Sequence, residues 1–334
     1  MAWITRRAAL TGAASLAAFG SRAATPATLF VSHPATLGHD PGPGWPESPE
    51  RLRAIFSTLS DARFASLARL EAPAVPREAL LRVHATAYLD RFEKASPREG
   101  RAHLGADAIM SAGTLAAAMR AAGGAVAAVD AVMTKQARNA FVASRPPGHH
   151  ALAEAPMGFC FFNNAAIAAR HAMAAHGAER VAIVDFDVHH GNGVQEIFWN
   201  EKNVLYCSTH QMPHYPGSGA VTETGAYDNI VNAPLRKGDA GDVFREALRA
   251  RILPRVDAFA PDIIVICAGF DAHLHDPLGG LRLTEEDFRD VTLRVMEIAA
   301  RRCGLRIVSL LEGGYNPKDL ASSVAAHISA LASA

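Results

Sequence analysis

The chain has 334 residues, of which 49% are hydrophobic and 20% are charged, as in an ordinary globular protein. Its 33 basic and 33 acidic residues give a formal net charge of zero, which argues against a nucleic-acid-binding surface and against electrostatic docking to a membrane. A chain of this length can bury a large core, and we find no apolar run in its body that is long enough to span a bilayer.

The first residues differ in composition from the rest of the chain. Arg6 and Arg7 precede a short apolar run, and an Ala-x-Ala-like site of small residues follows near Ala23. This layout is typical of an export signal of the twin-arginine type. We therefore expect residues 1–24 to be a signal, residues 25–334 to be the folded catalytic domain, and the protein to be exported to the periplasm. The alternative is a basic extension on a cytoplasmic protein.

Apolar strands and helical patterns alternate along the remaining sequence. The pattern predicts, in chain order, strand 28–31, a helix that starts within 46–55, helix 105–135, strand 140–144, helix 164–176, strand 181–187, strand 204–208, helix 242–259, strand 263–268, helix 285–302, strand 307–311 and helix 317–331. Thr284 and Asn316 are the expected N-caps of the last two helices. Continuous Val/Ile strands that alternate with helices indicate one α/β domain with a parallel sheet covered on both faces.

The four cysteines are Cys160, Cys207, Cys267 and Cys303. They show no Cys-x-x-Cys spacing, and three of them lie inside apolar stretches. We therefore expect small buried hydrophobic side chains, with neither a disulfide framework nor a thiolate metal site.

The most informative polar residues follow the apolar strand that begins at Val181. Asp185, Asp187 and His189 are spaced two residues apart, and in an extended strand side chains at this spacing project from one face. Burying carboxylates at this density costs free energy unless a cation or hydrogen bonds compensate them. We interpret the segment as a divalent-metal site, with a solvent-facing charge cluster as the alternative.

Further polar motifs follow the other apolar strands. The tandem histidines His149 and His150 follow strand 140–144, Asp271 follows the strand ending at residue 268, and Tyr315 follows the strand ending at residue 311. Each motif alone is more often structural. In an open parallel sheet, however, the carboxyl ends of the strands meet in one crevice, so the motifs should converge.

The converging residues suggest hydrolytic chemistry. Asp187, His189 and Asp271 would give a metal three protein ligands and leave a position for water, which is the arrangement of catalytic sites. Such a metal lowers the pKa of water and polarises a carbonyl, and the tandem imidazoles suit general acid and base work. The Tyr315 hydroxyl could stabilise a developing oxyanion. The sequence therefore predicts metal-assisted hydrolysis of an amide or ester.

Seven stretches together carry a family resemblance. They are PESPERL from Pro46, RPPGHH from Arg145, GFCFFNN from Gly158, DFDVHHGNG from Asp185, YPGSG from Tyr215, AGFDAHLHDPLGG from Ala268 and LEGGY from Leu311. With these stretches, in this order, the chain resembles the zinc-dependent histone deacetylase family, and in detail its class II-like branch of bacterial amidohydrolases and acetylpolyamine amidohydrolases. The resemblance implies the single-domain arginase–deacetylase α/β fold, with a central, mostly parallel sheet of about eight strands flanked by helices on both faces.

The resemblance also implies two kinds of bound ion. Asp187, His189 and Asp271 match the family's zinc ligands, and ferrous iron is an alternative metal for the same site. A structural potassium ion is implied as well, with ligands carried over to the backbone oxygens of Asp185, Asp187 and His189 and to Ser208 and Thr209.

The resemblance further implies five catalytic residues. His149 and His150 match the tandem catalytic histidines, and Tyr315 matches the tyrosine that polarises the substrate carbonyl. Asp185 matches the carboxylate that orients His149. Asn192 stands opposite His150, where the class I branch has an acid, so the acid/base division between the two histidines could differ.

The implied substrate-binding residues form a tunnel and its rim. Gly158, Phe159 and Tyr215 match the tunnel for the acyl-lysine chain, and Asp107 matches the rim aspartate that binds the substrate backbone. Leu278 stands where polyamine-selective relatives carry a glutamate, so the attraction for a second ammonium group is missing.

The leading hypothesis is a zinc-dependent amidohydrolase that removes an acetyl or other short acyl group from a lysine-like amine. Its partner would be an acylated lysine or a small acylated amine. Acetylpolyamine hydrolysis on the same fold is the first alternative. A non-catalytic acyl-ligand binding protein is the second, and a ureohydrolase is the third.

Overall fold

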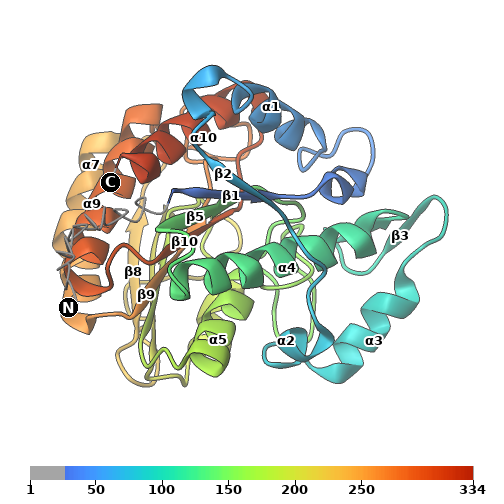
Figure 1. Cartoon of the computed structure of the whole chain (residues 1–334), viewed down its shortest axis with the longest axis horizontal. Coiled ribbons are helices and arrows are strands. Elements are labelled where there is room, and N and C mark those ends of the chain that lie inside the picture. Colours follow the sequence, from blue (N-terminus) through green and yellow to red (C-terminus); the bar gives the residue numbers. More distant parts are fainter. Residues whose placement is uncertain (1–26, 334) are drawn as a thin grey trace, which may run out of the picture.

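The computed structural model describes residues 27–333, so the expected export signal, residues 1–24, lies outside the described residues. Its centre is an eight-stranded parallel sheet in the order β2-β1-β5-β10-β9-β6-β7-β8 (Figure 1). The strands of this sheet are β1 (Leu29–Ser32), β2 (Ala68–Glu71), β5 (Asn139–Val142), β6 (Val181–Asp185), β7 (Val204–Gln211), β8 (Ile230–Leu235), β9 (Ile263–Ala268) and β10 (Ile307–Leu311). A small antiparallel pair, β3 (Arg101–His103) and β4 (Ile109–Ser111), lies apart from it.

Helices cover both faces of the sheet. They are α1 (Glu50–Thr58), α2 (Arg77–Leu81), α3 (Thr86–Ala95), α4 (Thr114–Met133), α5 (Asn164–His176), α6 (Asn192–Phe198), α7 (Gly241–Ala247), α8 (Leu253–Phe259), α9 (Glu285–Arg302) and α10 (Pro317–Ala332). One face carries α1, α7, α9 and α10, and the other carries α4 and α5 (Figure 1). The expected α/β architecture with eight strands is therefore confirmed.

The two faces of the sheet contribute to two separate hydrophobic clusters. In β9, Val265 packs into the cluster on the α4 and α5 side, while the next residue, Ile266, packs into the cluster beneath α9 and α10. Because side chains alternate along a strand, a sheet covered on both faces needs apolar residues at every position. This explains the continuous Val/Ile runs that marked the strands in the sequence.

Several predicted elements have the expected bounds. Strands 263–268 and 307–311 and helices 164–176 and 285–302 are present as β9, β10, α5 and α9. Thr284 and Asp287 form a reciprocal capping box at the start of α9. The side chain of Asn316 caps α10 by accepting a hydrogen bond from the Lys318 amide.

Two helices differ from their predicted bounds. The helix expected at 105–135 starts only at Thr114, because residues 109–111 form β4 and pair with β3. The helix expected at 242–259 is divided into α7, a π-helical turn at Leu248–Ile252, and α8. Pro254 lies at the start of α8 and has no N–H to continue the i to i−4 ladder, which explains the interruption.

By length and composition alone, helix α4 could cross a membrane. The prediction that no apolar run in the body of the chain is long enough to do so is therefore wrong. Of its most apolar window, 67% is buried inside the fold, so α4 is a core helix of this domain. Gly123 permits the close packing, because a Cβ there would lie 2.0 Å from the carbonyl oxygen of Pro73.

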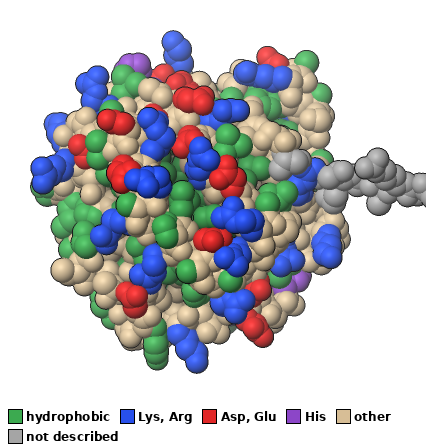
Figure 2. Space-filling view, turned by 90° about the vertical axis from the view of Figure 1, so that its left-hand side faces the viewer, with side chains coloured by type: hydrophobic (Ala, Val, Ile, Leu, Met, Phe, Trp, Pro, Cys, Tyr) green, Lys and Arg blue, Asp and Glu red, His purple; other side chains and the backbone are tan. Residues whose placement is uncertain are grey.

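The other surface features agree with the composition. Basic and acidic side chains are interspersed on the face that carries α7 and α9 (Figure 2). All four cysteines are buried and free, as expected.

Candidate active site

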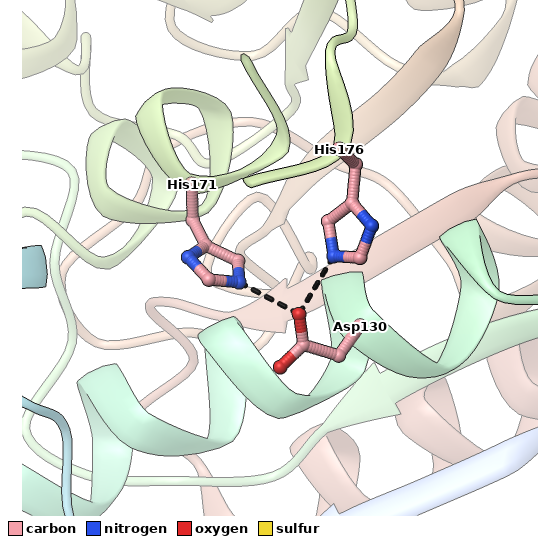
Figure 3. Close-up of side chains that lie close together, drawn as sticks. All are labelled: Asp130, His171 and His176. Carbon is pink, nitrogen blue, oxygen red and sulfur yellow. Dashed lines mark hydrogen bonds and ion pairs between the residues drawn. The ribbon is translucent and has the colours of Figure 1, made fainter. Parts of the chain in front are cut away.

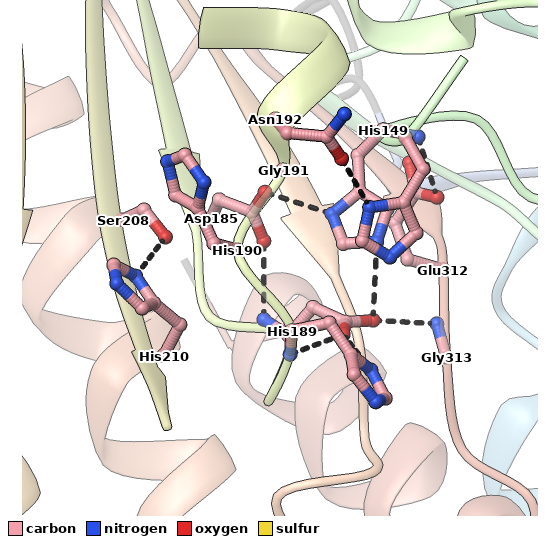
Figure 4. A network of polar contacts seen from close by, with 12 residues as sticks. His149, Asp185, His189, His190, Gly191, Asn192, Ser208, His210, Glu312 and Gly313 are labelled. Atoms are coloured by element: carbon pink, nitrogen blue, oxygen red, sulfur yellow. Dashed lines mark hydrogen bonds and ion pairs between the residues drawn. The ribbon is translucent and has the colours of Figure 1, made fainter. Parts of the chain in front are cut away.

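The strand β6 ends at Asp185, two residues earlier than expected. The Asp185 carboxylate accepts a hydrogen bond from the Asp187 amide (3.1 Å), and the Asp187 carboxylate accepts one from the His189 amide (2.9 Å). Such side-chain to backbone bonds compete with the strand ladder and turn the chain away from the sheet. The expectation that these side chains share one face of an extended strand is therefore wrong. The turn still brings His189 to the strand ends (Figure 4), and Asp187 reaches the loop after β10, where it contacts the Gly313 amide.

Two carboxylates and one imidazole meet at these strand ends. The Nδ1 atom of His189 lies 3.1 Å from Asp187 Oδ1 and 3.0 Å from Asp271 Oδ2. All three side chains are buried, and their candidate ligand atoms lie within 4.8 Å of one another. The Gly313 amide donates to Asp187 (2.8 Å) and the Val188 amide donates to Asp271 (2.8 Å), so both carboxylates are held in place.

Charge is crowded in this group. Burial opposes the protonated form of His189, but the carboxylates of Asp187 and Asp271 raise its pKa to about 10. Burial and the neighbouring Asp187 carboxylate raise the pKa of Asp271 to about 7. A single proton on Nδ1 can make a full hydrogen bond to only one of the two carboxylates at a time. A divalent cation would contact all three groups, so the residues fit a metal.

Two other groups of histidine and aspartate in the described chain have comparable spacing. They are Asp130, His171 and His176, and His273, His275 and Asp319. Each contains an exposed residue, whereas the group of Asp187, His189 and Asp271 is buried throughout. This burial, together with the position of His189 in the wall of a cavity, distinguishes it.

The tandem histidines face different partners. The Nδ1 atom of His149 lies 3.0 Å from Asp185 Oδ2, which also accepts a hydrogen bond from the Tyr206 hydroxyl (2.9 Å). His150 Nδ1 donates to the Oδ1 atom of Asn192 at 2.8 Å. Although burial disfavours the charged form, the carboxylates around His149 raise its pKa well above the usual value. Burial and the nearby imidazoles lower the pKa of His150 well below it.

A cavity of about 310 Å³ opens onto this group. Its lining comprises Trp45, Asp107, His150, Gly158, Phe159, His189, His214, Tyr215, Leu278 and Tyr315. All five residues expected from the resemblance to bind substrate are in this lining, together with His150, His189 and Tyr315. The structure thus brings these eight of the sequence-predicted site residues around one cavity.

The rim of the cavity has polar contacts of its own. The Tyr215 hydroxyl donates to a carboxylate oxygen of Asp107 at 3.0 Å. His214 donates from Nε2 to the Leu278 carbonyl (2.8 Å), and its ring stacks on that of His189 with centroids 5.0 Å apart. These contacts hold the loop after β7 against the loops that carry Asp107 and Leu278.

Sequence reasoning missed four residues of the site. Trp45 and His214 complete the cavity lining, and no periodic pattern marks these loop positions. Glu312 accepts hydrogen bonds from the backbone amides at positions 148 (2.7 Å) and 149 (3.1 Å), and so positions the tandem histidines. The Arg51 guanidinium lies 4.9 Å from the ring centroid of Tyr315. The last two lie within quoted motifs, which is the signal that could have found them.

The fold and the donor groups at its strand ends define an α/β enzyme with a candidate metal centre. Residues 45–331 match the histone deacetylase domain, and the chain therefore belongs to the histone deacetylase family. Membership makes it a hydrolase of the deacetylase and amidohydrolase kind.

Known relatives agree with this membership. The histone deacetylase-like amidohydrolase of Pseudomonas aeruginosa is 42% identical over 292 residues, which cover 86% of this chain and 75% of that protein. A probable deacetylase of Archaeoglobus fulgidus is 38% identical and covers 86% of this chain and 81% of its own length. The crystal structure of the HDA15 HD domain superposes with a TM-score of 0.86 at 35% identity, covering 91% of this chain and 88% of that one.

Proposed function

We propose that this protein is a zinc-dependent amidohydrolase that removes an acetyl or other short acyl group from a lysine-like amine. The observation that carries the proposal is the buried group of Asp187, His189 and Asp271 beside a cavity with aromatic walls. Two carboxylates offset the charge of a divalent cation, and an imidazole nitrogen completes a three-ligand set. Ferrous iron is the alternative metal for these donors.

When bound, the divalent cation polarises the substrate carbonyl and lowers the pKa of a water molecule. The proton of that water needs an acceptor, and His150 is suited to this role because it lines the cavity and its pKa is lowered. Since Nδ1 of His150 donates to Asn192, a neutral ring keeps its lone pair on Nε2. We assign to His150 the uptake of this proton and its delivery to the leaving amine.

His149 has a different part in this proposal. It is buried behind His150, their ring centroids are 4.0 Å apart, and Asp185 holds its Nδ1 proton. The carboxylates that raise its pKa favour the imidazolium form of this ring. Its positive charge stabilises the negative charge that develops on the substrate carbonyl oxygen, and so the two histidines divide electrostatic and proton-transfer work.

Tyr315 supplies a hydrogen-bond donor to the same oxygen. Its side chain lines the cavity, and burial raises the pKa of its hydroxyl well above the usual value, so the proton is retained at neutral pH. Phe159 packs edge-on against it, with centroids 5.9 Å apart, and excludes water from one wall. An aromatic lining of this kind suits an alkyl chain that carries the acyl amide.

A structural potassium ion is also part of the proposal. Asp185 and Ser208 are partners in the register of β6 and β7, and both are buried. The adjacent Thr209 hydroxyl is buried and has no hydrogen-bond partner among residues 27–333. The backbone oxygens of Asp187 and His189, in the neighbouring turn, would complete this group of donors. Oxygen donors gathered in this way favour a hard monovalent cation.

The rim favours a substrate with one amine. Leu278 gives the entrance an apolar surface, and one oxygen of Asp107 is engaged by Tyr215. Leu278 therefore offers no charge to a second ammonium group, so an acyl-lysine in a peptide, or a simple acylated amine, suits this entrance better.

Turnover of the zinc-loaded protein against a matched panel tests this function. The panel contains an acetyl-lysine peptide, longer acyl-lysine peptides, acetylputrescine and acetylspermidine, each with and without a hydroxamate. We expect hydroxamate-sensitive turnover, with the acetyl-lysine peptide preferred over both polyamines. A preference for the polyamines would overturn the substrate class, and tight binding of all members without turnover would favour an acyl-ligand binding protein.

A further inference from the structure

Three side chains on α4 and α5 form a compact cluster that does not line the active-site cavity. The Nε2 atoms of His171 and His176 both lie 2.7 Å from the same oxygen of Asp130, Oδ1. Both rings point from the α5 side toward the carboxylate on α4 (Figure 3). The candidate ligand atoms of the three residues lie within 4.8 Å of one another.

The surroundings of this cluster are electrostatically suited to a cation. Asp130 lies in the last turn of α4, and His176 is the final residue of α5. The carboxyl end of a helix carries a partial negative charge, and here two such ends meet at one carboxylate. The last turn of α4 contains no basic residue to offset this charge.

Access and rigidity also agree with a metal site. The His171 and His176 side chains are only 12% and 18% exposed, so packing holds their rings, whereas the Asp130 side chain is 50% exposed. A cation could therefore enter from solvent on the carboxylate side and retain water in its remaining positions. Two imidazoles and one carboxylate form a donor set for Zn²⁺ and similar borderline divalent cations.

We propose that Asp130, His171 and His176 form a second divalent-metal site, separate from the active site. Each imidazole binds the cation through Nε2, and the proton that Nε2 now shares with Asp130 passes through solvent to Nδ1. When this proton moves from Nε2 to Nδ1 of the same ring, the step releases no net proton. The bound cation links the carboxyl ends of α4 and α5.

Arg82 gives this proposal a distinctive signature. Its guanidinium lies 3.1 Å from Nδ1 of His171, and a guanidinium only donates, so Nδ1 is the acceptor in this structure. With a cation on Nε2, Nδ1 carries the proton and would face a donor and a positive charge. Arg82 must then swing away, and among residues 27–333 its one further polar contact is the long one to Glu78, at 3.5 Å. Arg82 therefore opposes metal binding.

The test measures zinc content of the full-length, zinc-loaded protein by equilibrium dialysis against buffered free Zn²⁺. We expect wild type to hold one zinc ion more per chain than His176→Gln. We also expect Arg82→Gln to bind the additional zinc about tenfold more tightly than wild type, because glutamine removes the charge and offers an oxygen to the Nδ1 proton. Deacetylase turnover, measured alongside, should be unchanged in both variants.

Equal zinc content in wild type and His176→Gln would overturn the site. Unchanged or weaker affinity in Arg82→Gln, which retains all three ligands, would overturn it as well, even if His176→Gln folds poorly. Absence of deacetylase turnover in wild type would count against the proposed function and not against this site, because the three ligands do not line the active-site cavity.

Discussion

Asn192 is the residue that separates the two tandem histidines chemically. It gives His150 a neutral partner, whereas His149 has the Asp185 carboxylate. In Asn192→Asp, the new carboxylate should raise the pKa of His150. A raised pKa leaves less unprotonated base at low pH, so the acidic limb of the kcat/KM profile should move upward by about one pH unit. Asn192→Ala, which adds no charge, is the control. An unmoved limb in Asn192→Asp would show that His150 is not the base.

Tyr315 is the residue proposed to stabilise the developing oxyanion. Tyr315→Phe removes only the hydroxyl and keeps the ring against Phe159 and beside Arg51. We expect kcat to fall by roughly a hundredfold to a thousandfold, as for the loss of an oxyanion donor elsewhere. Thermal unfolding and zinc content, measured on the same preparation, should match wild type. Near wild-type turnover would remove this role from Tyr315.

Tyr215 is the residue that joins the two sides of the rim. Tyr215→Phe deletes the 3.0 Å hydrogen bond to Asp107, so the carboxylate loses its fixed position. We expect KM for an acetyl-lysine peptide to rise about threefold to tenfold, which corresponds to one hydrogen bond, with kcat nearly unchanged. Steady-state kinetics on peptide and free acetyl-lysine separate the two parameters. A fall in kcat with KM unchanged would place Tyr215 in the chemistry instead.

The loop after β10 positions the metal-ligand candidates through its backbone. A Cβ on Gly313 would lie 1.9 Å from an oxygen of Asp271 and 2.6 Å from one of Asp187. Gly313→Ala should therefore displace these carboxylates and lower both zinc content and turnover while the fold persists. Gly38→Ala is the control, because the backbone there is not left-handed and the nearest atom to an added Cβ, the Cα of Gly113, lies 3.5 Å away. Full zinc content in Gly313→Ala, measured after dialysis, would contradict the proposed ligand set.

At the level of elements, the sequence predicted those strands and helices whose positions follow from hydrophobic periodicity. The interior strands β9 and β10 and helices α5 and α9 were located correctly, because burial dictates their residue pattern. The edge strands β2 and β8 were missed for two physical reasons. Every residue of β2 is exposed, so it has no apolar pattern, and β8 contains Pro234, which only an edge strand tolerates.

The site shows the same division between patterned and unpatterned residues. The motifs at the ends of β5, β6, β9 and β10 converge because all of these strands are parallel and adjacent, which the sequence pattern implied. Trp45 and His214 reach the cavity from loops whose course depends on tertiary packing. No local periodicity encodes such a course, so these two residues could not be found in advance.

The stability of the whole molecule should depend on pH through buried neutral histidines. Burial lowers the pKa of His327 to about 3; its Nδ1 donates to Thr292 and its Nε2 accepts from Ser309. The unfolded chain binds a proton near pH 6.5 and the folded chain does not, so stability falls as the pH drops below 6.5. Between pH 6.5 and 5 this histidine should cost about 2 kcal/mol of the free energy of unfolding.

Denaturant unfolding of wild type and His327→Gln at several pH values measures this contribution. The variant should be less stable at pH 7, and its stability should fall less steeply toward pH 5. Parallel pH dependences in the two proteins would show that His327 is already protonated in the folded state.

The most direct test of the account is acetate release from an acetyl-lysine peptide by metal-free protein to which zinc is returned. We expect wild type to regain turnover as the site of Asp187, His189 and Asp271 fills, and we expect a hydroxamate to abolish it. Asp271→Asn, which lacks one ligand charge, should remain inactive at the same free zinc concentration. Turnover that is independent of zinc, or that is equal in Asp271→Asn, would contradict the proposed metal centre.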